Sequence, residues 1–290
     1  AIKSWWQKIL RQTTPPADIL DIGCGNAALL IELLEQRMNG TYTGVDLAGV
    51  RLNEVAKQKL KQSTGLSALL KPHTNAEDLP LKSESIDLAA SVFGIEYSDL
   101  RKSLPESIRV LRPNGVFHAL VHADESVIST MSARALSEFQ DADMGSIVDN
   151  LRVIDQQLNE LRVPARLKQS RPSEAARINL NGLAQKYMSN LNPDTGNAIM
   201  VQFVGDALKY FKMLNQSDTI RAQYIDGIEA EFQASRQRYT AMAAAAQSET
   251  DITSIRTLLQ QQNCAAVSVE KFFADEEQRE LGGWHISVRK

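Results

Sequence analysis

Two short segments near the start of the chain have the residue types and spacing of a nucleoside site. Residues 19–26 read Ile-Leu-Asp-Ile-Gly-Cys-Gly-Asn, and residues 42–47 read Tyr-Thr-Gly-Val-Asp-Leu. The first segment is an apolar strand that ends in a glycine turn, and the second is a strand that ends in an acid. Glycines let the backbone approach a ligand, and the carboxylate of Asp46 can accept hydrogen bonds from two ribose hydroxyls. The layout therefore predicts a nucleoside pocket.

Asp21, inside the first segment, indicates which nucleoside to expect. A carboxylate beside the glycine turn would repel a pyrophosphate, but it suits a ligand with a positively charged amino group. S-adenosylmethionine has such a group and a positive sulfonium. A nicotinamide dinucleotide is the formal alternative, because residues 23–28 also fit its glycine fingerprint, with Asp46 at a plausible distance. Asp21 and the lack of a recognisable set of hydride-transfer residues argue against a dehydrogenase.

Size, charge and cysteine content restrict the class of protein. The chain has 290 residues, of which 43% are hydrophobic and 23% are charged, and its formal net charge is -3. These values fit a globular protein and give no electrostatic reason to expect a nucleic-acid partner. Cys24 and Cys264 cannot form a disulfide framework and show no metal-ligand spacing, so we expect no metal and a reducing, cytoplasmic compartment. No apolar run is long enough to span a membrane, and the start lacks a signal-peptide core.

Strand and helix patterns alternate from about residue 18 to 124, which predicts a parallel sheet covered on both faces. The expected strands are 19–22, 41–46, 66–71, 86–93 and 116–121. The expected helices are 27–38, 50–62 and one that ends at Arg109. The Pro-Asn-Gly turn at 113–115 should stop this last helix, and Pro105 should lie in its first turn, where a missing N–H costs nothing.

The alternation ends near residue 124, and almost everything up to 247 predicts helix. Apolar residues recur there at helical spacing, in one stripe of Ile147, Leu151, Ile154, Leu158 and Leu161 and in a second of Ile199, Phe203, Ala207 and Phe211. A helix over 253–262 and strands over 265–272 and 284–289 follow, and the polar linker 274–283 could join these strands as an antiparallel pair. The economical interpretation is a sheet interrupted by a helical insert and then completed.

Four landmarks in order resemble the class I S-adenosylmethionine-dependent methyltransferases, in particular the small-molecule branch typified by quinone-biosynthesis C-methyltransferases. They are Asp-Ile-Gly-Cys-Gly at 21–25, Gly-Val-Asp-Leu at 44–47, Asn-Ala-Glu-Asp-Leu-Pro at 75–80 and Arg-Val-Leu-Arg-Pro-Asn-Gly at 109–115. The resemblance covers residues 18–123 and, more weakly, 250–290. It implies a Rossmann-like α/β fold with a mostly parallel seven-stranded sheet, an antiparallel last strand, and here a large helical insert after strand five.

The resemblance also implies three parts of the chain and a set of cofactor-binding residues. Residues 1–124 and 248–290 would form the cofactor-binding core, and residues 125–247 a helical insert or cap. Asp21, Gly23 and Gly25 would line the methionine part of the cofactor, and Asp46 would hold the ribose diol. The expected set is completed by Leu47, Asn75, Ala76, Ser91 and Phe93.

Two positions depart from the pattern of the family. Asn75 stands where the family usually has an aspartate that contacts the adenine amino group, and its side-chain oxygen can still accept that hydrogen bond. Ala76 would offer its backbone N–H to the adenine ring. Ala27 stands where the family often has glycine, which makes the turn less permissive. Neither departure removes a needed chemical group.

Candidate catalytic residues follow strands four and five, because ligands of open α/β sheets lie beyond the carboxyl ends of the strands. Glu96 could orient a substrate or accept a proton, and Tyr97 could line the substrate pocket; a solvated loop acid beside a core aromatic is the alternative. His122 lies at the end of strand five and could act as general base, although a structural histidine is the commoner case. His118 lies four residues earlier and should be more enclosed.

The expected reaction is an in-line displacement that moves the methyl group of S-adenosylmethionine to a small-molecule acceptor and leaves S-adenosylhomocysteine. The insert would close the acceptor pocket as a cap. A macromolecule methyltransferase whose insert docks protein or RNA, and a non-catalytic cofactor-binding scaffold, stay open as alternatives. The basic residues Arg162, Arg166, Lys168, Arg171 and Arg177 could meet an anionic partner, and the stripe from Ile147 to Leu161 could form a homodimer interface, although a solvated face and packing within the insert are the commoner outcomes.

Overall fold

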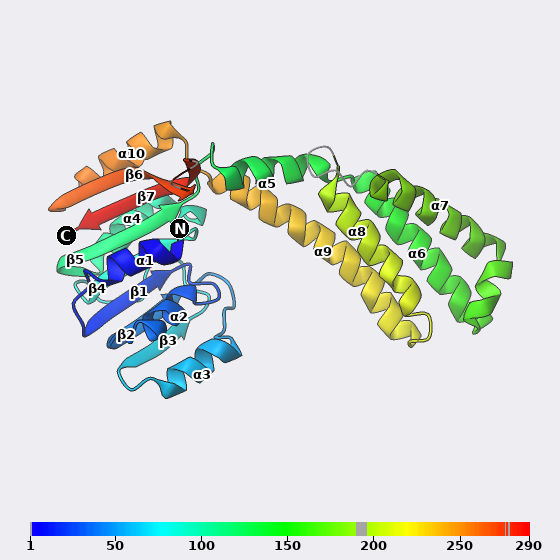
Figure 1. The fold of residues 1–290 in the computed structure, drawn as a ribbon, viewed down its shortest axis with the longest axis horizontal. Coiled ribbons are helices and arrows are strands. Elements are labelled where there is room, and N and C mark those ends of the chain that lie inside the picture. The colour runs from blue at the N-terminus through cyan, green and yellow to red at the C-terminus, as the bar shows by residue number, and fades with distance from the viewer. Residues whose placement is uncertain (1, 190–195, 276, 278) are drawn as a thin grey trace. The chain divides into compact units, whose positions relative to one another are not determined.

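The protein consists of two compact units (Figure 1), seen in a computed structural model that describes residues 2–189, 196–275, 277 and 279–290. Unit 1 comprises residues 1–130 and 242–290, and unit 2 comprises residues 131–241. Within the described ranges, no helix is both long enough and apolar enough to cross a membrane.

Unit 1 is built around a seven-stranded sheet. Its strands are β1 (Ala17–Ile22), β2 (Gly40–Val45), β3 (Leu66–Lys71), β4 (Ile86–Val92), β5 (Leu111–Val121), β6 (Ala266–Asp275) and β7 (Glu280–Arg289). Its helices are α1 (Ile2–Leu10), α2 (Ala28–Glu35), α3 (Glu54–Gln62), the short 3₁₀ turn η1 (Ile95–Tyr97), α4 (Leu100–Arg109) and α10 (Glu249–Gln260). The helices α5 (Val127–Glu138) and α9 (Asp218–Ala245) run across the two unit boundaries.

The strand order of the sheet is β3-β2-β1-β4-β5-β7-β6. All neighbouring pairs up to β5 are parallel, whereas β7 runs antiparallel to both β5 and β6. This topology confirms the predicted Rossmann-like fold with an antiparallel last strand. Strand order reverses at β1, which lies between β2 and β4. In open α/β sheets, ligands bind at the carboxyl ends of the strands at such a point.

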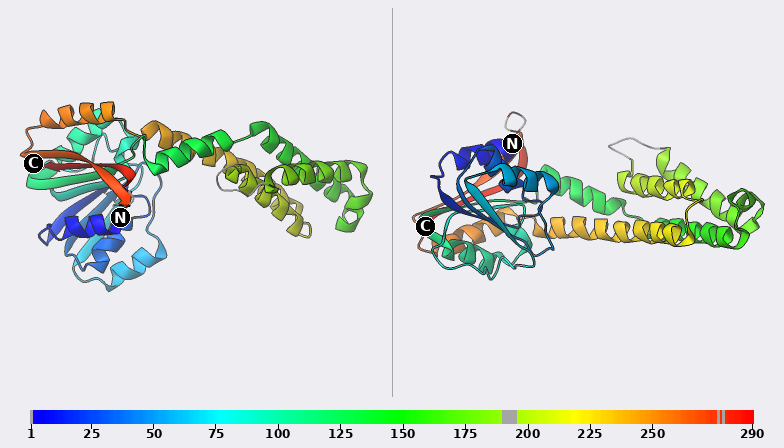
Figure 2. Two further views of the ribbon diagram at one scale, coloured as in Figure 1. Left: turned by 45° about the horizontal axis from the view of Figure 1, so that its top comes forward. Right: turned by 90° about the horizontal axis from the view of Figure 1, so that it is seen from below.

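Helices cover both faces of the sheet (Figure 2) because successive strand residues point to opposite sides. Ile19 packs with Trp6 and Leu30 on the face covered by α1, α2 and α3. Its neighbour Leu20 packs with Ile108 of α4 and with α10 on the other face. Two separate apolar cores therefore hold the strand ends in a fixed register.

Several expected boundaries were wrong. The helix α4 already begins at Leu100, where the Asp99 side chain accepts a hydrogen bond from the Arg101 N–H at 3.1 Å, so Pro105 lies inside the helix and not in its first turn. The strand β5 begins at Leu111 and contains the Pro-Asn-Gly segment, which therefore does not stop the helix. The reason is pairing at the chain end, because the N–H of Asn114 donates to the carbonyl of Lys290 at 3.0 Å.

Other differences have local causes. The helix α3 starts at Glu54, four residues later than expected, because Asn53 caps it by accepting from the Ala56 N–H at 2.8 Å. The strands β6 and β7 extend into the expected polar linker and pair as far as Asp275 and Glu280. The helix α1 was not predicted, although its buried residues Trp5, Trp6, Ile9 and Leu10 have helical spacing.

Unit 2 has its own apolar core. Its helical elements besides α5 and α9 are α6 (Asp141–Leu161), η2 (Pro164–Gln169), α7 (Arg171–Met188), α8 (Ala198–Lys209) and η3 (Tyr210–Lys212). Both predicted apolar stripes face this core. The stripe from Ile147 to Leu161 therefore packs in the core of unit 2 and is not exposed as a dimer interface. A buried ion pair between Arg221 Nε and Asp155 Oδ1 at 2.6 Å joins α9 to α6.

Candidate active site

The glycine turn after β1 forms the centre of the site. Gly23 has φ +68°, and a Cβ there would come within 2.8 Å of the Cα of Gly94, so the turn packs directly against the segment after β4. Gly25 has φ +46°, and a Cβ there would meet nothing within 4 Å. The backbone of Gly25 therefore borders open space that a ligand can approach closely.

Asp46 connects the end of β2 to this turn. Its Oδ2 atom accepts the Gly25 N–H at 2.9 Å, and its Oδ1 atom accepts the Ala48 N–H at 2.8 Å. Each carboxylate oxygen keeps a second acceptor position. Two such positions on one rigidly held carboxylate match the two adjacent hydroxyl donors of a ribose. Leu47, the next residue, is 72% exposed and free to cover a ligand.

Asp21 lies near the end of β1, just before the glycine turn, and has a hydrogen-bond partner that the sequence did not indicate. Its Oδ2 atom accepts a hydrogen bond from the Tyr42 hydroxyl at 2.7 Å. Burial raises the pKa of Asp21 to about 7, the bond from Tyr42 opposes this, and the nearby Asp46 carboxylate raises the pKa further. A cationic ligand group would favour the charged form of such a carboxyl group.

The loop after β3 lies beside Asp46, because the Thr74 N–H donates to the Asp46 carbonyl at 2.9 Å. The side-chain oxygen of Asn75 accepts the Glu77 N–H at 3.0 Å, which folds the loop locally and leaves one acceptor position on that oxygen. Ala76 packs against the apolar core. The loop is thus held where it can supply a donor and an acceptor to an adenine ring.

The segment after β4 is fixed by Ser91. Its hydroxyl donates to the Ile22 carbonyl at 2.7 Å and accepts the Ile95 N–H at 2.9 Å. Both contacts are buried and go to the backbone, so the observed role of Ser91 is to join the end of β1 to η1. Phe93, two residues later, has φ +53°, and its N–H donates to the Leu120 carbonyl of β5 at 2.8 Å.

Glu96 and His122 form a buried pair at the ends of β4 and β5. The Glu96 Oε1 atom lies 2.7 Å from Nδ1 of His122 and also accepts the His122 backbone N–H at 3.1 Å. The side chains of His122 and Glu96 are 6% and 0% exposed. The rings of Phe93 and Tyr97 flank the imidazole, with centroids at 4.4 and 6.1 Å. The sequence predicted the two residues separately, and the structure brings them together.

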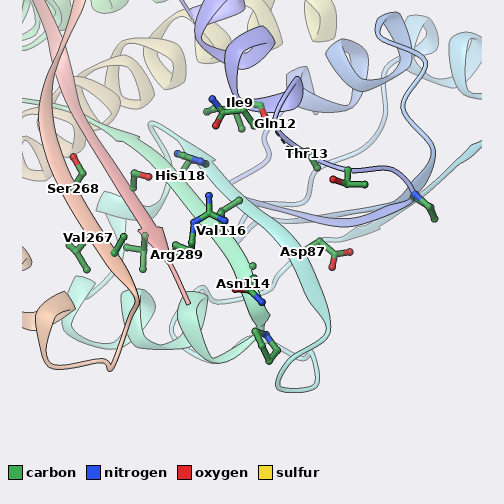
Figure 3. A pocket seen from close by; sticks show the side chains of 17 residues that line it. Ile9, Gln12, Thr13, Asp87, Asn114, Val116, His118, Val267, Ser268 and Arg289 are labelled. Atoms are coloured by element: carbon green, nitrogen blue, oxygen red, sulfur yellow. Dashed lines mark hydrogen bonds between the residues drawn. The ribbon is translucent and has the colours of Figure 1, made fainter.

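His118 has different surroundings, although it lies on the same strand. Its Nδ1 atom lies 3.1 Å from Nε2 of His285, and burial, with smaller effects of His285 and Arg289, lowers the pKa of His118 to about 4. His118 lines a cavity of about 540 Å³ near the amino ends of the parallel strands (Figure 3), together with Asp87, Asn114 and Val116. This cavity lies away from the glycine turn, and no residue predicted for the cofactor lines it.

The donor and acceptor set at the carboxyl ends fits an adenosyl sulfonium amino acid. The open space at Gly25 admits the ligand backbone, Asp46 offers acceptors for ribose, and Asp21 offers a carboxyl group for a cation. Nothing in this arrangement favours the two phosphates of a dinucleotide, because a carboxyl group lies beside the turn.

Comparison with known proteins agrees with this fit. Residues 20–119 match the family described as methyltransferase domain. The ubiquinone/menaquinone biosynthesis C-methyltransferase of Bartonella tribocorum is 32% identical over 123 residues, which cover 40% of this chain and 46% of that protein. The phthiotriol/phenolphthiotriol dimycocerosates methyltransferase of Mycobacterium tuberculosis is 33% identical over 102 residues, with coverage of 34% and 35%.

Among solved structures, the YcgJ protein of Bacillus subtilis is 21% identical, with coverage of 45% of this chain and 58% of that chain and a TM-score of 0.35. The chain spans less than half the length of the curated relatives given above. The matching region contains the end of β1, β2 to β4, the glycine turn and Asp46. Residues 20–119 therefore carry the sequence pattern of the methyltransferase domain family.

Proposed function

We propose that the protein transfers a methyl group from S-adenosylmethionine to a small-molecule acceptor. The observation that carries this proposal is the Asp46 carboxylate, which is fixed by the Gly25 and Ala48 N–H groups beside open space. The relatives named for quinone and phthiotriol methylation support a small molecule as acceptor. In the basic stretch that could meet an anionic macromolecule, Arg177 is already paired with Glu174.

The residues of the chain would mainly bind and align the reactants. Asp46 would hold the ribose, Asp21 the charged amino end, and Asn75 with Ala76 the adenine; Leu47 and Phe93 would cover the ligand. When bound, S-adenosylmethionine supplies a methyl group that its positive sulfur already activates. Alignment of two bound reactants can contribute about 7–11 kcal/mol in favourable cases. Glu96 and His122 are the proposed catalytic residues, and Tyr97 is proposed to contact the acceptor.

We further propose that unit 2 takes part in acceptor binding as a cap. The support lies in unit 1, where the segments that lead into and out of the helices are tied to each other beside His122. The Gln247 N–H donates to the His122 carbonyl at 2.7 Å, and the Asp124 N–H donates to the Gln247 carbonyl at 3.2 Å. A ligand that binds at His122 would therefore affect the backbone hydrogen bonds of both segments that connect unit 1 to unit 2.

Thermal unfolding with nucleoside ligands tests the proposed cofactor. All three tryptophans of the chain, Trp5, Trp6 and Trp284, belong to unit 1, so their fluorescence reports on this unit. S-adenosylhomocysteine at about 100 times its dissociation constant should stabilise unit 1 by about 2.7 kcal/mol. NAD at the same concentration should give no shift. Stabilisation by NAD alone would point to a dehydrogenase and contradict the proposal.

Hydrogen exchange tests the proposed cap. Addition of S-adenosylhomocysteine and a turnover-competent acceptor should slow amide exchange in unit 2, whereas S-adenosylhomocysteine alone should slow it mainly around residues 21–25 and 46–48. Exchange in unit 2 that stays unchanged with both ligands would contradict the cap and leave the methyl transfer proposal intact.

A further inference from the structure

The hydrogen bonds between Glu96 and His122 define which atoms of the pair are free. Two donors, the backbone N–H and Nδ1 of His122, both reach the single atom Oε1 of Glu96, at 3.1 and 2.7 Å. With Glu96 as a carboxylate, whose oxygens can only accept, Nδ1 carries the ring proton. In the neutral ring, Nε2 is then an acceptor. Among the described residues, the His122 side chain forms its hydrogen bond through Nδ1 and not through Nε2.

The second carboxylate oxygen is also free. The Oε2 atom of Glu96 is fully buried and has no hydrogen-bond partner among the described residues. A buried acceptor without a donor is unfavourable, so a donor from a water or from a bound molecule would stabilise it. Both free atoms of the pair, Oε2 and Nε2, are acceptors. A molecule that binds against them must bring hydrogen-bond donors.

The surroundings restrict the chemical class of this molecule. Phe93 stacks on the imidazole at 4.4 Å and Tyr97 meets its edge at 6.1 Å, so the site has aromatic walls. In the described part of the chain, Glu96 forms no ion pair with a lysine or an arginine. A carboxylate acceptor would face two acceptor atoms with no cation to neutralise it. A neutral group with a hydrogen-bond donor, such as a hydroxyl, supplies the missing donor and introduces no uncompensated charge.

The pair lies at the cofactor end of the sheet and not at a remote site. Gly94, two residues before Glu96, lies against the glycine turn at Gly23, and Ser91 joins the same segment to the end of β1. His122 follows β5 on the other side of β4, which pairs with both β1 and β5. The pair therefore lies beside the segments at which the methyl donor is proposed to bind.

We propose that Glu96 and His122 act together as the base of an O-methyltransferase that takes a neutral, weakly acidic hydroxyl acceptor. The inference rests on the proposed function. The acceptor oxygen gives its proton to Nε2 of His122 and forms the new O–C bond, while the S–C bond of the bound sulfonium breaks and its electron pair stays on sulfur. The carboxylate of Glu96 holds Nδ1–H and balances the charge of the imidazolium. The proton then passes to water.

Labelled methyl transfer to matched probes tests the acceptor class. The protein is incubated with S-adenosylmethionine that carries a ¹³C methyl group and with phenol or catechol, and in parallel with aniline or thiophenol. We expect the label on oxygen. Label on nitrogen, sulfur or carbon only, or no label on any hydroxyl probe, overturns the inference. Calorimetry with S-adenosylhomocysteine separates failure of the inference from failure of the proposed function. If the proposed function is wrong, S-adenosylhomocysteine should not bind; if only the acceptor class is wrong, it should still bind.

Variants test the pair itself. His122→Asn and Glu96→Gln should each lower kcat for the hydroxyl probe by about 10²-fold or more, in the range of general-base catalysis, with the affinity for S-adenosylhomocysteine unchanged. Glu125→Gln, which neutralises an exposed acid three residues after His122, should keep wild-type kcat. Equal kcat values for His122→Asn and the control would overturn the inference.

A spectroscopic readout does not depend on activity. In ¹⁵N NMR of the protein bound to S-adenosylhomocysteine, the neutral ring of His122 should be protonated at Nδ1 and unprotonated at Nε2. In Glu96→Gln, whose amide can also act as a donor to the ring, part of the population should shift to the other tautomer. A wild-type ring with its proton on Nε2 would contradict the assigned direction of proton transfer.

Discussion

Two histidines, one within β5 and one directly after it, show how the two ends of the sheet differ. His118 lies beside a second imidazole and Arg289, and burial keeps it neutral by lowering its pKa to about 4. His122, four residues later, donates Nδ1–H to the buried carboxylate of Glu96 at 2.7 Å. The first arrangement lines a cavity near the amino ends of the strands, and the second lies at the carboxyl ends beside the glycine turn. The residue type is the same, and the partner decides what chemistry it can do.

The first contrast concerns two acids at opposite ends of the sheet. Asp46→Ala removes the acceptors for ribose and the bonds to Gly25 and Ala48, and it should cost about 3 kcal/mol of S-adenosylhomocysteine binding, roughly 10²-fold. Asp87→Asn, at the start of β4, breaks a contact with Arg112 but should leave this affinity within about twofold. Calorimetry of both variants checks the contrast, which fails if the two lose affinity equally.

The second contrast concerns stability against pH. The pKa of His118 is about 4 in the folded protein and ~6.5 in an unfolded chain. The unfolded state therefore binds more protons between these pH values, and about 3 kcal/mol of stability is lost as pH falls through the window. The pKa of Asp21 is about 7 in the folded protein and ~3.9 unfolded. Here the folded state binds more protons, so stability is lost as pH rises, by roughly 3–4 kcal/mol.

Denaturant unfolding at pH 5 and pH 7, followed by tryptophan fluorescence, separates these opposite contributions. From pH 5 to pH 7, His118→Asn should lose stability relative to wild type, and Asp21→Asn should gain it. Identical pH dependence in all three proteins would mean that neither group titrates as its surroundings indicate.

The two glycines of the turn should separate folding from binding. Gly23→Ala meets the Gly94 backbone at 2.8 Å at a positive φ and should destabilise unit 1 by about 2–4 kcal/mol. Gly25→Ala has free space around the added methyl group and should cost about 1 kcal/mol of stability. Its main effect should be weaker S-adenosylhomocysteine binding. Thermal unfolding and calorimetry of both variants measure this, and wild-type affinity in Gly25→Ala would argue against the assigned crevice.

The smallest expected effect is a proton released on binding. At pH 6 the Asp21 carboxyl group, with its pKa of about 7, is mostly protonated, and a cationic amino group would drive its ionisation. Binding of S-adenosylmethionine should release up to about one proton at this pH. Calorimetry in two buffers with different ionisation enthalpies detects the release. Asp21→Asn is the control and should release none; equal release from both proteins would exclude Asp21 as the source.

The sequence was most informative where short loops set the geometry. The glycine turn and Asp46 lie in two short contiguous motifs, so residue types and spacing predicted the strands β1 and β2, which the structure confirms. The same motifs predicted a nucleoside pocket, which stays a prediction. The pairing of Glu96 with His122 could not be predicted, because it joins loops after two different strands across 26 residues of sequence. Tyr42 was missed for the same reason, since its bond to Asp21 crosses from β2 to β1.

The predicted helix and strand boundaries were wrong where tertiary contacts override the local sequence pattern. Pro105 was placed by its usual preference for a helix start, but the Asp99 cap begins α4 earlier. The Pro-Asn-Gly segment looked like a turn, but pairing with the chain end at Lys290 keeps it within β5. In unit 2 the apolar stripes predicted the core correctly, because helical spacing is local, and they carried no signal of a ligand.

The position of a bound ligand tests the central claim most directly. A crystal structure of the protein with S-adenosylhomocysteine should show the ribose hydroxyls on the two oxygens of Asp46 and the adenine beside Asn75 and Ala76. The homocysteine end should lie near Gly25. Binding of the ligand in the cavity that His118 lines, or at no defined place in unit 1, would contradict the assignment of the carboxyl ends of β1, β2 and β4 as the active site.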